Sequence, residues 1–97
     1  MRLVWSRFAL ADRDEIFTYI EADNPKAAAH IDEQIAFSAR RLVEFPESGR
    51  IGRVAGTREL VIPRTPYIAA YVVIEDKVRI LRVLHGAQVW PEQLSED

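Results

Sequence analysis

Hydrophobic residues recur with different periods in the two halves of the chain. Residues 2–6 alternate like a short strand, with Leu3 and Trp5 on one face. Residues 7–22, and a second segment from about 25 to 45, place apolar residues three or four positions apart. That spacing is typical of amphipathic helices. The first half therefore predicts a strand followed by two helices.

The ends of these helices carry local signals. Ser6 stands where an N-cap is needed before the first helix, and Asn24 stands at the same place before the second. Pro25 suits the first helical position, because the N–H that it lacks needs no partner there. Pro46 ends the second helix. Two helices joined by so tight a turn form a helical hairpin.

The second half of the chain predicts strands. Residues 58–63, 67–75 and 77–85 are short runs rich in β-branched residues, separated by turn signals. Residues 46–57 hold three glycines and one proline, so we expect a loop there, and the least ordered stretch of the chain. The tail from residue 86 onwards is expected to form at most one short helical turn.

The order β-α-α-β-β-β is typical of an α+β fold. The 97 residues suffice for one domain and not two, so we expect residues 1–97 to form a single domain. The predicted architecture is an antiparallel sheet with the N-terminal helical hairpin packed on one face.

Both faces of the predicted sheet are apolar. Along residues 67–75 and 77–85, both alternating sets of side chains are largely hydrophobic, whereas a sheet with one wet face alternates apolar and polar residues. The hairpin can cover only one face, and soluble monomers rarely expose so large an apolar patch. We therefore expect a helix or strand of a second polypeptide to cover the other face. The alternative is that loop 46–57 and the tail fold back over it.

Composition excludes several classes of function. The chain has no cysteine, which excludes disulfides, thiol catalysis and Cys-based zinc sites. His30 and His85 lack the spacing of metal ligands, so we expect no metal and no cofactor. The N-terminus does not resemble a signal peptide, and no apolar run approaches the roughly 20 residues that span a bilayer. We expect a cytoplasmic protein without membrane contact.

Positive charge is concentrated in one segment. The chain has 13 basic and 15 acidic residues, a net charge of −2, whereas proteins that bind polyanions are usually basic. Residues 50–64 nevertheless set four arginines against a single carboxylate, that of Glu59. Arginine suits planar contacts with carboxylate or phosphate. These arginines either face a target or are solvated charges paired with the acidic helices.

The chain resembles the RelE/ParE superfamily of bacterial toxins across nearly its whole length. Each shared motif is weak alone, but the ordered set at these spacings is fairly specific. The motifs are Tyr19-Ile20, Asn24-Pro25-Lys26-Ala27-Ala28, Phe45-Pro46, Gly56-Thr57-Arg58-Glu59-Leu60, Tyr67, Tyr71, Ile80-Leu81-Arg82-Val83-Leu84-His85 and Gln88-Val89-Trp90-Pro91. The resemblance implies the toxin of a type II toxin–antitoxin system, silenced by a cognate antitoxin that wraps it.

Two mechanisms occur in this superfamily. RelE-like toxins cut messenger RNA on the ribosome, using strand lysines, arginines and a late tyrosine, whereas ParE-like toxins inhibit DNA gyrase. Here residues 58–63 contain no lysine, Ile68 stands where an arginine is expected, and the tail has neither arginine nor tyrosine. These departures favour a ParE-like, non-enzymatic gyrase inhibitor. An inactive toxin fold that serves only as a binding module is a further alternative.

A nuclease remains possible through a late histidine. His85 as acid or base, with Arg82 and Glu59, would make such a catalytic set. The alternative is that His85 ends its strand and bonds to the backbone or to Trp90. Arg82 lies on an apolar strand face and needs a carboxylate, from the antitoxin or from Glu59, because an unpaired buried charge is costly.

Seven residues are candidates for contact with the target or the antitoxin. They are the arginines, aromatic residues and histidine that the resemblance and the strand pattern single out. Trp90 is expected to act as a packing anchor for the tail rather than as a platform for stacking bases. The set is Arg58, Arg64, Tyr67, Tyr71, Arg82, His85 and Trp90.

Overall fold

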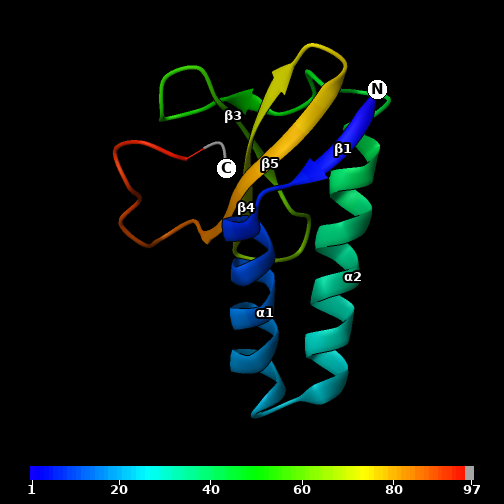
Figure 1. Ribbon diagram of the computed structural model, residues 1–97. Coiled ribbons are helices and arrows are strands. Elements are labelled where there is room, and N and C mark those ends of the chain that lie inside the picture. The colour runs from blue at the N-terminus through cyan, green and yellow to red at the C-terminus, as the bar shows by residue number, and fades with distance from the viewer. Residues whose placement is uncertain (96–97) are drawn as a thin grey trace.

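The computed structural model describes residues 1–95 and follows the predicted order with one added strand (Figure 1). The helices end slightly earlier than predicted, and residues 86–95 contain turns but no helical turn. The elements are β1 (Arg2–Trp5), α1 (Arg7–Glu21), α2 (Pro25–Arg41), β2 (Arg50–Ile51), β3 (Arg58–Val61), β4 (Tyr67–Ile74) and β5 (Lys77–His85).

The predicted caps begin both helices. The Ser6 hydroxyl accepts a hydrogen bond from the Ala9 N–H at 3.0 Å and donates one to the Leu81 carbonyl at 2.7 Å. The Asn24 side chain accepts from the Ala27 N–H at 3.1 Å, and Pro25 occupies the first turn of α2. Ser6 therefore joins the start of α1 to the sheet as well as capping it.

The sheet has five strands in the order β1-β5-β4-β3-β2. The antiparallel pairings of β3 with β4 and of β4 with β5 are confirmed. The expectation of a wholly antiparallel sheet is wrong at one ladder, because β1 pairs with β5 in parallel. The helical hairpin is a crossover connection that returns the chain to the same sheet, and such a connection permits parallel pairing.

One face of the sheet packs against the helices. Figure 1 shows α1 and α2 side by side against the strands. The core joins Ile35 and Ala39 of α2, and Leu42 directly after the helix, to the inward side chains of the strands. Those inward side chains are Tyr67, Ala69, Tyr71, Val78, Ile80 and Val83.

A β-bulge changes which residues of β5 face this core. Ala70 pairs with Arg82 and Tyr71 pairs with Ile80, so Leu81 is an extra residue in β5. Simple alternation predicted that Arg82 would share a face with Ile80, but Val83 joins the core instead. A bulge shifts the alternation beyond it by one residue.

The opposite face of the sheet, called the far face below, is buried by the chain itself. Ile68, Ala70, Leu81 and Leu84 lie outside the core cluster, yet each is at most 7% exposed. Residues 54–57 and 92–94 line a hollow together with Leu81, and Figure 1 shows the tail (orange to red) on the side of the strands away from α2. The expectation that a second polypeptide must cover this face is therefore wrong.

Candidate functional site

A buried carboxylate on the far face organises loop 46–57. Glu59 of β3 is 2% exposed and accepts hydrogen bonds from the Nε atoms of Arg50 and Arg53, at 3.2 and 3.0 Å. It also accepts from the Nη2 atom of each arginine and from the Arg53 backbone N–H. The predicted loop is thus held in place, and Arg50 forms part of the short strand β2.

These contacts keep Glu59 ionised. Burial by itself raises the pKa of this carboxyl, but the hydrogen bonds from Arg53 and Arg50 and the charge of Arg53 outweigh burial and lower the pKa from 4.5 to about 2. Glu59 is a charged anchor at neutral pH and not a proton donor.

Arg53 joins this anchor to the tail. Its guanidinium carbon lies 3.8 Å from the ring centroid of Trp90, within cation–π distance. The Trp90 Nε1–H donates to the His85 carbonyl at 3.2 Å. Trp90 therefore holds the tail against the end of β5, as a packing anchor would.

His85 lies beside Tyr67 at the end of the sheet. Its Nδ1 atom accepts from the Ala87 N–H at 3.0 Å, and its ring meets the Tyr67 ring edge-on, with centroids 5.7 Å apart. His85 therefore ends its strand and bonds to the backbone. It shares a small polar cleft with Glu15, Gln88 and other residues.

Arg82 finds its carboxylate on α1. Its Nε and Nη2 atoms donate to Asp12 at 2.7 and 2.9 Å, and the Val83 N–H donates to the same carboxylate at 2.9 Å. The expectation that Glu59 or an antitoxin supplies this partner is wrong. Sequence reasoning missed Asp12, although its spacing of three residues from Ala9 and four from Ile16 puts it on the inward stripe of α1.

The proposed nuclease set is not assembled as one cluster. Arg82 pairs with Asp12, while Glu59 pairs with Arg50 and Arg53. Within residues 1–95, His85 makes no hydrogen bond to Arg82 or Glu59. Each polar member of the set is thus committed to a different structural contact.

Tyr71 and Arg58 hold the start of loop 46–57. The Tyr71 hydroxyl donates to the Pro46 carbonyl at 2.7 Å and accepts from the Gly49 N–H at 3.0 Å. Arg58 donates to the Gly49 carbonyl at 2.8 Å. Tyr71 is completely buried, which raises the pKa of its hydroxyl. We assign Tyr71 to the fold rather than to a contact surface.

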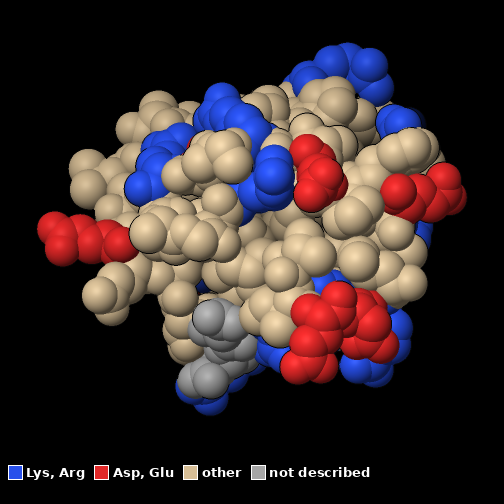
Figure 2. All heavy atoms as spheres, turned by 90° about the horizontal axis from the view of Figure 1, so that it is seen from above, with Lys and Arg blue, Asp and Glu red and all other residues tan. Residues whose placement is uncertain are grey.

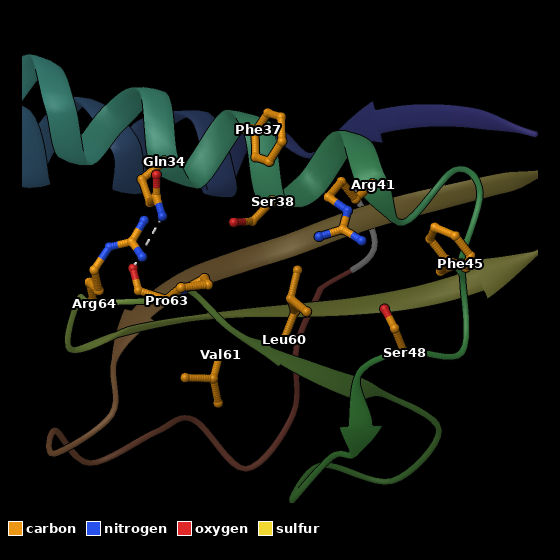
Figure 3. A pocket seen from close by; sticks show the side chains of 10 residues that line it. All are labelled: Gln34, Phe37, Ser38, Arg41, Phe45, Ser48, Leu60, Val61, Pro63 and Arg64. Atoms are coloured by element: carbon orange, nitrogen blue, oxygen red, sulfur yellow. Dashed lines mark hydrogen bonds between the residues drawn. The ribbon is translucent and has the colours of Figure 1, made fainter.

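A second surface feature is a groove between α2 and β3, called the α2–β3 groove below (Figure 3). Its apolar side chains include Phe37 and Phe45, which are 54% and 53% exposed. Arg41 and Arg64 supply its charge, and no Asp or Glu among the described residues lines it. The residues that line it are Gln34, Phe37, Ser38, Arg41, Phe45, Ser48, Leu60, Val61, Pro63 and Arg64.

The described residues contain no group of three or more histidine or acidic side chains that could hold a metal ion. Across the same residues, no helix has the length and apolar character needed to cross a membrane. Charge on the surface is uneven: Figure 2 shows basic side chains close together on one part of the upper surface and a group of acidic side chains apart from them.

Comparisons with known proteins place these features in a family context. Residues 3–90 match the family model described as the ParE toxin of the type II toxin–antitoxin system, parDE. The protein named toxin Y4kP, of Sinorhizobium fredii, is 46% identical over 93 residues, covering 96% of each chain. Toxin RelE2 of Caulobacter vibrioides is 38% identical over 88 residues, covering 91% of this chain and 98% of its own.

A solved structure has the same fold. It is described as the chromosomal ParDE toxin–antitoxin system from P. aeruginosa, and one of its chains superimposes with a TM-score of 0.81 at 31% sequence identity. The match covers 88% of this chain and 95% of that chain. The likeness therefore extends over almost the whole domain.

Proposed function

Because this chain belongs to the ParE toxin family of type II toxin–antitoxin systems, we propose that it inhibits DNA gyrase by binding and that a cognate antitoxin neutralises it. The observation that supports gyrase inhibition over RNA cleavage is that the candidate nuclease residues are engaged in structural contacts. General acid–base catalysis needs groups free to exchange protons with substrate. Arg82 and Glu59 are tied into separate ion pairs, and the pKa of Glu59 is too low for a proton donor.

The α2–β3 groove is the proposed antitoxin site. It presents exposed Phe37, Phe45 and Val61 beside Arg41 and Arg64, and none of the carboxylates in residues 1–95 lines it. An amphipathic helix with an apolar stripe and flanking acidic residues would match both the shape and the charge of such a groove. Since the chain buries its far face by itself, this groove is the better candidate for the partner's apolar contact.

Gyrase inhibition is tested with purified toxin and gyrase in a supercoiling assay. We expect loss of supercoiling at stoichiometric toxin, and restoration when antitoxin is added first. Replacing His85 by Ala should leave the inhibition unchanged, because no chemistry passes through that ring. Unimpaired gyrase at excess folded toxin would contradict the proposal.

The groove is tested separately by Phe37→Glu, which puts a charge into its apolar wall. Antitoxin affinity should fall at least about tenfold, or about 1.4 kcal/mol, since the new carboxylate removes an apolar contact and repels the acidic residues of the proposed helix. The matched control is Leu10→Glu on α1, at a side chain 47% exposed and outside the groove. Equal loss in both variants, or none in Phe37→Glu, would place the antitoxin elsewhere.

A ribosome-dependent endoribonuclease is the second candidate, favoured by the relative named toxin RelE2 and by the position of His85 beside Tyr67. Primer extension on translated messages after toxin induction distinguishes the two. Under the nuclease hypothesis new cleavage sites appear and His85→Ala abolishes toxicity. If overexpression without antitoxin is harmless, the chain is instead an inactive toxin fold that serves as a binding module.

A further inference from the structure

Two arginine side chains are held side by side on one buried carboxylate. Glu59 receives the Nε and Nη2 atoms of both Arg50 and Arg53, and it uses the Nη1 atom of neither. A guanidinium has five N–H donors. Donors of both residues are therefore left over for a group that approaches from outside.

This arginine pair carries excess positive charge. Two guanidinium groups share a single carboxylate, and their side chains are 54% and 41% exposed, whereas that of Glu59 is 2% exposed. The negative charge lies beneath and the positive charge at the surface. Such an arrangement attracts an anion and fixes the donors before it arrives, which reduces the ordering cost of binding.

The Arg53 guanidinium also offers a flat surface. The guanidinium carbon lies over the Trp90 ring, 3.8 Å from its centroid, and the side chain remains 41% exposed, so we expect the side of the guanidinium away from Trp90 to be accessible. Nucleic-acid bases stack on guanidinium planes as well as on aromatic rings. Stacking of this kind contributes binding without selecting a particular base.

We propose that Arg50, Arg53 and Trp90 form a binding site for one unpaired nucleotide of a nucleic-acid strand. Arg50 and the free edge of Arg53 contact the phosphate, and the base stacks on the outer face of the Arg53 guanidinium, which Trp90 supports from below. An acidic peptide would use the same N–H donors but would leave the stacked plane unused, so the geometry favours a nucleotide. The site is independent of whether gyrase is the target.

The overall charge of −2 limits the affinity that we expect for a nucleic-acid strand. Few phosphates are neutralised, so binding should be weak and should weaken with salt, with a slope of roughly −0.7 in log affinity against log salt for each phosphate contacted on a single strand. One or two contacts predict a shallow slope. A steep slope would indicate an extended polyanion surface, which contradicts a one-nucleotide site.

The two tryptophans make the experiment internally controlled. The indole N–H signal of Trp90 reports on the site, and that of Trp5 reports on β1, where Arg13 lies 4.6 Å from its ring centroid. Titrating ¹⁵N-labelled wild-type protein with a short oligothymidylate at low salt should shift the Trp90 signal and leave that of Trp5 in place. A parallel titration with oligouridylate shows whether the source is DNA or RNA.

Variants then test the roles of the side chains. Arg53→Lys keeps the charge but loses the stacking plane, and we expect at least about a threefold loss of affinity for oligothymidylate, with a smaller loss for inorganic phosphate. The matched control, Arg7→Gln with Arg40→Gln, removes two exposed positive charges elsewhere and should change affinity less than twofold. No shift of Trp90, a shift with inorganic phosphate as strong as with the oligonucleotide, or tighter binding of an oligoglutamate peptide would each overturn the proposal.

Discussion

Glu59 gives the protein a pH dependence that can be measured. Its pKa is lowered from 4.5 to about 2 in the folded state, so the folded state favours the ionised carboxylate. The resulting stability is complete above pH 4.5 and is lost as the pH falls from there towards 2. The contribution is of the order of 3 kcal/mol at neutral pH, an upper value because both arginines are partly exposed to solvent.

Urea unfolding from pH 3 to pH 7 measures this contribution. Wild type should exceed Glu59→Gln in stability at pH 7, and the gap should narrow on acidification. The control is Glu47→Gln. Glu47 is exposed, and within residues 1–95 its carboxylate forms no ion pair. A gap that is constant with pH would show that Glu59 acts through packing alone.

Asp12 offers a second test of how much a single residue contributes to stability. Asp12→Ala leaves Arg82 and the Val83 N–H without their acceptor, and removing one member of a largely buried ion pair should cost about 2–4 kcal/mol. Asp14→Ala, at an exposed position two residues away, should cost less than about 0.5 kcal/mol. Thermal unfolding of both variants gives the comparison, and similar melting temperatures would refute the role of Asp12.

The sequence predicted that Arg82 needs a carboxylate partner, but it did not predict that Asp12 supplies it. The reason is physical: an aspartate on an inward helical stripe looks like an error in the pattern until the strand opposite it is known. Glu59 shows the same limit. Its four neighbouring arginines were visible in the sequence, but only the fold shows that Arg50 and Arg53 converge on it while Arg58 turns to the backbone.

Among the elements, α1 depends on a cap that serves two purposes. Ser6→Ala removes the acceptor for the Ala9 N–H and also leaves the Leu81 carbonyl without its donor. We expect a loss of about 1.5–3 kcal/mol, more than a simple cap is worth. Asn24→Ala, an exposed cap without a second bond, should cost only about 1 kcal/mol. Equal losses in chemical denaturation would show that the Leu81 contact contributes nothing.

The backbone of the turn between β4 and β5 is strained at one residue. Glu75 has φ of 55°, in the left-handed region that disfavours residues with a Cβ. Glu75→Gly should therefore raise the free energy of unfolding by about 0.5–1 kcal/mol, whereas Asp76→Gly, at a residue outside that region, should lower it. Denaturation midpoints of the two variants should move in opposite directions.

The elements themselves were predictable because their signals are local. Ser6, Asn24 and Pro25 mark helix starts through contacts within one turn. The bulge at Leu81 was not predictable, since an extra residue in β5 is defined only by its register against Ala70 and Tyr71 of β4. For the same reason β2 was missed: its two residues are a strand only by pairing with Arg58 and Glu59.

At the scale of the whole molecule, the tail closes the far face. Trp90→Ala removes the ring under Arg53 and the bond to the His85 carbonyl. We expect a loss of about 2–4 kcal/mol and stronger binding of an apolar fluorescent dye, because Leu81, which lines a hollow together with residues of the tail, becomes accessible. Val89→Ala, at a neighbouring side chain 94% exposed, is the control and should change neither quantity. An unchanged dye signal in Trp90→Ala would mean that the tail stays in place without its anchor.

The segments that cover the far face could not be predicted from the sequence. Apolar side chains on both faces of β4 and β5 indicate that each face must be covered, but they do not indicate which segment covers it. Loop 46–57 and the tail look unstructured in the sequence because their order comes from contacts that only the fold creates, those of Arg53 with the buried Glu59 and with Trp90.

The parallel pairing of β1 with β5 has a consequence for biosynthesis. Arg2 through Trp5 leave the ribosome well before their partners, Lys77 through Ile80. The hydroxyl that caps α1 likewise waits for the carbonyl of Leu81. Completion of the fold is therefore postponed until β5 has been translated, and contacts between residues so far apart in sequence slow folding further. A prematurely terminated polypeptide lacking β5 would never assemble a competent toxin.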